Sequence, residues 1–137
     1  MQKLQFEQAW DRTLSDKDRK MITALFKETS TSYNEEIHFT PVWQAKNYKG
    51  ELLITVIMHN YQSEPLRIIE QPFIITYQKE KIAENIFSLP FKIDAKTSMP
   101  WTFIFPTGSF VGFEDLVEDG LASNRELRLL MKEPNRL

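Results

Sequence analysis

The spacing of apolar residues predicts an α-helix near the start of the chain, over about residues 16–28. Its apolar residues recur at helical intervals and give one narrow face: Met21, Ile22, Leu25 and Phe26. Ser15 is followed three residues later by Asp18, a variant of the capping box that marks the helix start. Because a single amphipathic helix of this length is only marginally stable alone, we expect it to dock on a sheet or on a partner.

From residue 36 onward the period changes to two, which predicts β-strands. The most regular stretch is 51–61. One face of it carries Leu52, Ile54, Val56 and Met58, and the other carries Leu53, Thr55, Ile57 and His59. Since both faces are largely apolar, we expect a central strand covered by an opposing sheet on one side and by the helix on the other.

A second marked stretch, 98–106, places Trp101, Phe103 and Phe105 on one face of a strand between Pro100 and Pro106. Three large aromatic side chains on one face bury much apolar area, which predicts a core strand with a buried Trp101. Proline has no N–H group, so each proline is expected to resist extension of the ladder.

The remaining strands are less regular. Pro72 predicts an edge strand or one that changes sheet, and 109–113 suggests another short strand. The apolar residues near the end alternate as in a strand: Leu127, Leu129 and Met131. Ser123 or Asn124 could instead cap a helix over 126–132; we favour the strand, although periodicity does not decide over so few residues.

Short turns without helical crossovers favour a mainly β protein, an immunoglobulin-like antiparallel β-sandwich of about seven strands with one N-terminal helix. A chain of 137 residues fits a single domain. We divide 1–137 into an N-terminal segment with the helix (1–35), the sandwich (36–113) and a C-terminal extension (114–137).

Composition and charge restrict the partners. The net charge of −2 and the lack of a basic stripe argue against nucleic acid. With no cysteine there are no disulfides and no thiolate chemistry. The N-terminus lacks an apolar signal segment and no apolar run is long enough to span a bilayer, so we expect a cytoplasmic protein without a transmembrane segment, for which peripheral membrane association stays open.

No catalytic, cofactor-binding or metal-binding constellation emerges. The two histidines, His38 and His59, lack ligand spacing and are expected to be ordinary sheet residues. Ser109 lies outside any G-x-S-x-G motif. The acidic pairs Glu35-Glu36 and Glu114-Asp115 are more typical of solvated loops than of glycosidase carboxylates.

Aromatic residues supply the candidate binding surface, for which we choose Trp43, Tyr48 and Tyr61. The three tryptophans would also suit a carbohydrate-stacking platform. The simpler interpretation places Trp101 in the core and uses Trp10 to anchor the N-terminal segment to the sheet.

Several runs also resemble a known family: Trp10-Asp11-x-Thr13-Leu14-Ser15-x-x-Asp18-Arg19, Phe39-Thr40-Pro41, Asn47-Tyr48-Lys49-Gly50-Glu51-Leu52, His59-Asn60 and residues 97–106. Over roughly residues 6–106 the chain resembles the SLAP domain of Firmicutes, especially bacilli (Bacillus). That domain occurs in two copies in an S-layer assembly protein tied to an accessory secretion system, and in single copies in small proteins. The resemblance implies a non-catalytic domain linked to bacterial surface-protein assembly, and it supplies no catalytic residues.

We therefore expect a non-enzymatic protein-interaction domain of a Gram-positive bacterium, with an unknown protein partner. Sheet edges can accept a partner strand, and they would equally allow homo-oligomers. The alternative is a β-sandwich that binds cell-wall carbohydrate or a small ligand, and the third interpretation is an uncharacterised enzyme.

Overall fold

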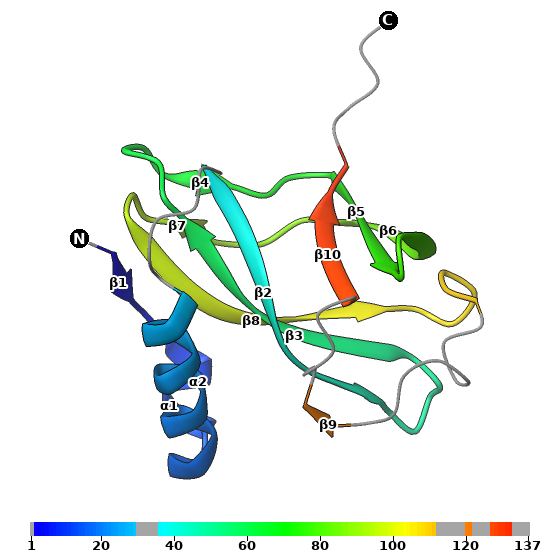
Figure 1. Ribbon diagram of the computed structural model, residues 1–137, viewed down its shortest axis with the longest axis horizontal. Helices are drawn as coiled ribbons and strands as arrows, with labels where there is room; N and C mark the ends of the chain where they lie inside the picture. The colour runs from blue at the N-terminus through cyan, green and yellow to red at the C-terminus, as the bar shows by residue number, and fades with distance from the viewer. Residues whose placement is uncertain (1, 30–35, 112–119, 122–126, 133–137) are drawn as a thin grey trace, which may run out of the picture.

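The computed structural model describes residues 2–29, 36–111, 120–121 and 127–132. The protein is mainly β with two N-terminal helices (Figure 1). The elements are β1 (Lys3–Leu4), α1 (Gln8–Thr13), α2 (Asp16–Thr29), β2 (Ile37–Lys46), β3 (Leu52–Asn60), β4 (Leu66–Arg67), β5 (Gln71–Tyr77), β6 (Glu80–Phe87), β7 (Lys92–Ile93), β8 (Thr97–Phe105), β9 (Gly120–Leu121) and β10 (Leu127–Met131).

The predicted helix is confirmed as α2, and Ser15 caps it by accepting the Asp18 N–H at 3.1 Å. The expectation of a single helix was wrong, because α1 precedes it. The Glu7 carboxylate caps α1 by accepting the Ala9 N–H at 2.8 Å. A helix of six residues is too short to show a period, and glutamate is not among the usual N-cap residues.

The main sheet has five strands in the order β1-β8-β3-β2-β9 and curls into a half-barrel (Figure 1). The pairs between β8, β3, β2 and β9 are antiparallel, but β1 runs parallel to β8. A three-stranded sheet, β10-β5-β6, and a two-stranded sheet, β4-β7, complete the fold.

The mainly β class is confirmed, but the immunoglobulin-like antiparallel sandwich gives way to this curled mixed sheet with small sheets. Two features of the chain explain the difference. The N-terminal segment enters beside β8 in the same direction, which makes the main sheet mixed. After Pro106 the chain leaves the main sheet and bridges Phe110 to Ala83 of β6.

β3 is the central strand that the sequence predicted, covered on both faces. Its inner face packs against the three-stranded sheet through an apolar core. The fully buried aromatic residues of this core are Phe73, Phe103 and Phe105. On the other face, Ile57 packs with Val42 of β2 and Ile22 of α2, so the helix docks on the sheet as expected.

The aromatic strand, β8, departs from the prediction at Pro100 and Trp101. Pro106 ends the strand, but Pro100 lies within it, opposite Ile57. Ser98 accepts the Gln5 N–H from the β1 side, and alternation then points the proline nitrogen away from β3, where its missing N–H costs no bond to that strand. Trp101 is half-buried rather than buried.

Pro72 was also misjudged, since β5 is the middle strand of its sheet. The proline is only the second residue of β5, and its carbonyl accepts the Lys132 N–H at 2.8 Å. At the C-terminal end the strand alternative is confirmed: β10 pairs with β5, and Leu127 and Leu129 are buried.

Some residues named from the sequence lie outside the described ranges. They are Glu35, Gly112, Phe113, Glu114, Asp115, Ser123 and Asn124. Of the segment 109–113, the described part contains the Phe110 bridge to β6.

Candidate functional site

One side of β8 is unpaired toward the C-terminal end of the strand, after the buried residues 97–100. β1 pairs only with Thr97 and Ser98. Because backbone groups alternate along a strand, the N–H and C=O groups of Thr102 and Ile104 point to the same side as those of Ser98. Within the described ranges, no backbone group bonds to Thr102 or Ile104 on that side. We call this segment, residues 101–104, the β8 edge.

Side chains at the β8 edge make it partly apolar. Ile104 is 46% exposed. The half-buried Trp101 packs its ring against Trp10 at 6.3 Å and against Phe91 at 4.9 Å between centroids. The edge therefore combines unbonded backbone groups with exposed apolar surface, which are the features that an added strand uses.

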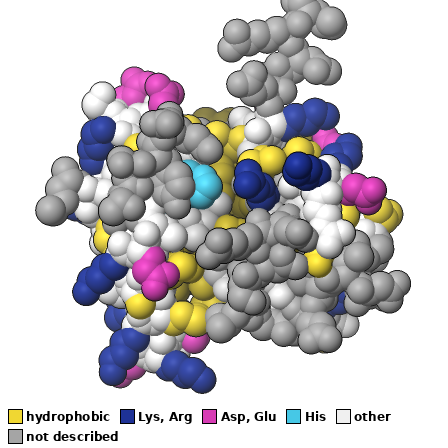
Figure 2. Space-filling model, in the orientation of Figure 1, with side chains coloured by type: hydrophobic (Ala, Val, Ile, Leu, Met, Phe, Trp, Pro, Cys, Tyr) yellow, Lys and Arg dark blue, Asp and Glu magenta, His cyan; other side chains and the backbone are white. Residues whose placement is uncertain are grey.

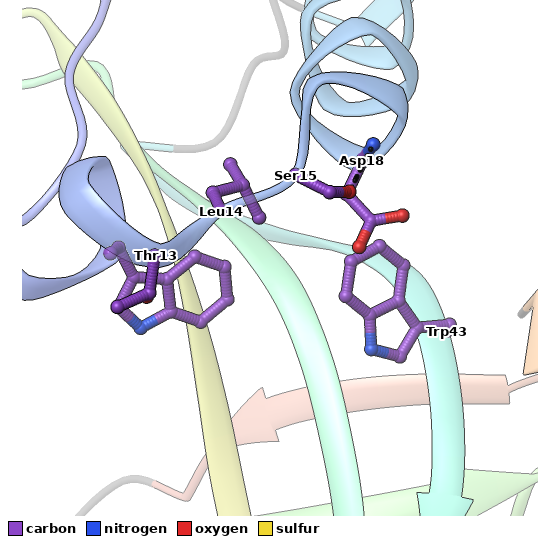
Figure 3. A pocket seen from close by; sticks show the side chains of 6 residues that line it. Thr13, Leu14, Ser15, Asp18 and Trp43 are labelled. Atoms are coloured by element: carbon purple, nitrogen blue, oxygen red, sulfur yellow. Dashed lines mark hydrogen bonds between the residues drawn. The ribbon is translucent and has the colours of Figure 1, made fainter.

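A pocket of about 290 Å³ lies on the opposite face of the main sheet from the core. We call it the Trp pocket. It is lined by Trp10, Thr13, Leu14, Ser15, Asp18 and Trp43. The junction of α1 and α2 forms one wall and β2 forms the other, and the side chain of Asp18 points toward the Trp43 indole (Figure 3). In the space-filling view, hydrophobic side chains reach the surface beside the helices (Figure 2).

The three residues chosen from the sequence as a binding surface do not come together. Trp43 is half-buried in β2 and lines the Trp pocket. Tyr48 is 93% exposed in the turn between β2 and β3. Tyr61 follows the far end of β3, where its hydroxyl donates to the Thr29 carbonyl at 3.1 Å. The sequence did not reveal that Trp10 and Asp18 would join Trp43.

A polar row that sequence reasoning missed crosses the helix-facing side of the main sheet. His38, His59 and Ser98 lie opposite one another on β2, β3 and β8. His59 is fully buried, and its ring stacks on the Tyr61 ring with centroids 5.4 Å apart. Phe26 of α2 stacks on the same imidazole at 6.5 Å. Only strand register brings these residues together, so no local sequence pattern could predict their contact.

The hydrogen bonds of His59 indicate which of its two ring nitrogens carries the proton. Thr29 donates its hydroxyl to the Leu25 carbonyl at 2.7 Å, so its oxygen, 3.4 Å from Nε2, is placed to accept a proton from that nitrogen. Nε2 also lies 3.0 Å from the Thr40 hydroxyl. Nδ1 is then the acceptor for the Ser98 hydroxyl at 2.6 Å. The neutral Nε2–H tautomer satisfies both ring nitrogens.

Burial, together with the smaller effect of the nearby His38, lowers the pKa of His59 from 6.5 to about 4. Ser98 and His59 have the spacing of a nucleophile and its base, but both side chains are fully buried. The Gln2 side chain also donates to the Ser98 oxygen at 3.0 Å. The row therefore joins the N-terminal segment, the sheet and the end of α2, and substrates have no access to it in this structure.

The described residues form neither a cluster of metal ligands nor a membrane-spanning helix. No group of three or more histidine, aspartate or glutamate side chains gathers as metal ligands there. None of the helices in those ranges is long and apolar enough to cross a membrane.

Comparison with known families decides the relationship. The family model described as the SLAP domain matches residues 4–120, which is most of the chain. The chain belongs to the SLAP domain family. The name of this family model refers to an association with accessory secretion. No curated protein and no solved structure matches the chain.

The SLAP match begins in β1 and reaches β9, so it extends beyond the region 6–106 that carried the resemblance. It contains both helices, the β8 edge and the Trp pocket. It ends before β10, which pairs with β5 inside the fold.

Proposed function

We propose that this SLAP domain is a non-enzymatic protein-interaction module that serves surface-protein (S-layer) assembly or secretion in a Gram-positive bacterium. It acts in the cytoplasm or at the inner face of the membrane. The chain belongs to a family named for accessory secretion, which supports a role in secretion or surface-protein assembly. The β8 edge supports the manner of binding, in which a partner protein adds an extended strand to the main sheet.

The β8 edge is the observation that carries the proposal. Thr102 and Ile104 offer N–H and C=O groups on the outer side of β8, next to the point where β1 stops pairing. Each hydrogen bond that a partner strand forms there contributes about 0.5–1.5 kcal/mol net. The exposed Ile104 side chain adds apolar contact area.

Pro100 sets the register of the partner. It is buried and has no N–H, so the partner gains no bond from a donor at this position. A strand centred on Thr102 and Ile104 satisfies its own backbone better than one shifted toward Pro100. Main-chain bonds then supply affinity, and the side chains beside Trp101 supply selectivity.

The test compares three forms of the protein as bait in the lysate of a bacillus with an accessory secretion system: wild type, Ile104→Pro and Ile104→Thr. The proline removes one outward N–H while leaving the bonds between β8 and β3, which lie on the other side. The threonine keeps the N–H and is a good strand residue, so it controls for the loss of the isoleucine side chain. Circular dichroism verifies that each variant is folded.

We expect a secretion or surface-layer protein that is retained by wild type and Ile104→Thr and lost, at least tenfold, with Ile104→Pro. A partner retained equally by all three forms would contradict strand addition at the β8 edge. If the bait retained only a second copy of this chain, the β8 edge would serve self-association instead of binding a partner protein.

A further inference from the structure

The Trp pocket contains a carboxylate for which the described residues supply no partner. Asp18 is half-buried, and its side chain points toward the Trp43 indole (Figure 3). No described residue forms an ion pair or a hydrogen bond with this carboxylate. Asp11, by comparison, lies nearby in α1 and is paired with Arg19 at 2.9 Å.

Helix capping does not account for the Asp18 side chain. Ser15 accepts the backbone N–H of Asp18, which is one half of a capping box. In the other half, the Asp18 carboxylate would accept the Ser15 N–H, and that bond is absent from this described segment. The carboxylate instead faces the pocket, which leaves it available to a ligand.

We propose that the Trp pocket binds the lysine side chain of a partner protein. The Asp18 carboxylate lies beside the Trp43 indole. Both groups favour a cation, because the carboxylate is negative and the π-face of an aromatic ring carries negative charge density. Lysine places a compact ammonium at the end of a flexible apolar stem, and the stem packs beside Leu14 while the head reaches the carboxylate.

The dimensions of the pocket favour a single side chain. Its volume of about 290 Å³ is at the lower limit of small-molecule sites, which measure roughly 300–1,000 Å³. A neutral oligosaccharide needs a longer platform, and it carries no charge to complement Asp18. The hydroxyls of Thr13 and Ser15 already form hydrogen bonds within the protein. Thr13 donates to the Ala9 carbonyl at 2.9 Å, and Ser15 accepts the Asp18 N–H.

This inference rests on the proposed function only in taking the partner to be a protein. Trp10 of the pocket contacts Trp101 of the β8 edge, but the two experiments substitute different residues and use different readouts, so they fail separately. Ile104→Pro leaves the Trp pocket intact, and the variants below leave the β8 edge intact.

The test is an NMR titration that follows the indole N–H signals of the three tryptophans. The probes are a tetralysine peptide, the same peptide with acetylated side chains, and chitotetraose as a wall-type sugar. The variants are Asp18→Asn, Trp43→Phe and, as a matched control, Asp16→Asn. Asp16 begins the same helix, is exposed and does not line the pocket, so its substitution removes an equal charge near the same helix end.

We expect tetralysine to shift the Trp10 and Trp43 signals in a saturable way, with no response to the acetylated peptide. Asp18→Asn and Trp43→Phe should each weaken the binding about fivefold, while Asp16→Asn changes it less than twofold. Three results would overturn the proposal: no shift at 10 mM peptide (roughly the weakest affinity such a contact gives), equal sensitivity to Asp16→Asn, or a response to the sugar in place of tetralysine.

Discussion

The Ser98 oxygen lies 2.6 Å from Nδ1 of His59, and both side chains are completely buried. The contact joins two neighbouring strands, β8 and β3, on the face where α2 docks. Because the imidazole is neutral and fully hydrogen-bonded in this place, its protonation would break the arrangement. The stability of the fold is therefore linked to pH.

The first prediction concerns that link. His59 has a pKa of about 4 when folded and an ordinary value of 6.5 when unfolded, so the unfolded chain binds more protons between these pH values. The free energy of unfolding should be fully retained above pH 6.5 and fall as the pH drops toward 4. Between pH 7 and pH 4.5 the two pKa values correspond to a loss of about 2.5 kcal/mol. Urea denaturation at pH 7 and pH 4.5 measures it.

Carboxylates also titrate in this range, so the pH dependence of stability has to be compared between wild type and histidine variants. His59→Asn should be less stable at pH 7 but lose less stability on acidification than wild type. His38→Asn keeps the buried imidazole and should retain most of the pH dependence. Equal pH slopes for wild type and His59→Asn would show that His59 does not carry the effect.

A second prediction separates the aromatic residues of β8. Phe103 is fully buried in the core, and Phe103→Ala should cost about 3–5 kcal/mol of unfolding free energy. Trp101 is half-buried beside Trp10, so Trp101→Ala should cost about half as much. Chemical denaturation of the two variants gives the comparison, and a Trp101→Ala cost equal to that of Phe103→Ala would place Trp101 in the core.

A third prediction tests the start of α2. Ser15→Ala removes the oxygen that accepts the Asp18 N–H and should cost about 1 kcal/mol. Thr13→Ala is the control, because its hydroxyl bonds to the Ala9 carbonyl inside α1 and should matter by less than about 0.5 kcal/mol. Thermal unfolding of both variants is sufficient. If they are equally stable, Ser15 does not act as a cap.

Local patterns in the sequence predicted α2, the two-faced β3 and the final strand. Each of these has a signal within its own residues: a cap with helical spacing, an apolar run on both faces, and alternation from Leu127 to Met131. The family relationship was also accessible, because long runs such as 97–106 are specific.

Features that depend on distant residues could not be predicted. The parallel pairing of β1 with β8 makes the main sheet mixed, and two residues of strand carry no pattern. Pro100 is tolerated within β8 because its nitrogen faces away from β3, at a position beyond the pairing with β1. His59 and Asp18 likewise acquire their surroundings from register and helix docking.

The central claim is that the β8 edge is open and receives a strand. Amide hydrogen exchange, followed by NMR residue by residue, tests it directly. In the free protein the Thr102 and Ile104 amides should exchange rapidly, whereas those of Trp101 and Phe103, which face β3, should be protected. When the captured partner is added, the Thr102 and Ile104 amides should become protected as well. Equal protection of all four amides in the free protein, or no change with the partner, would contradict the account.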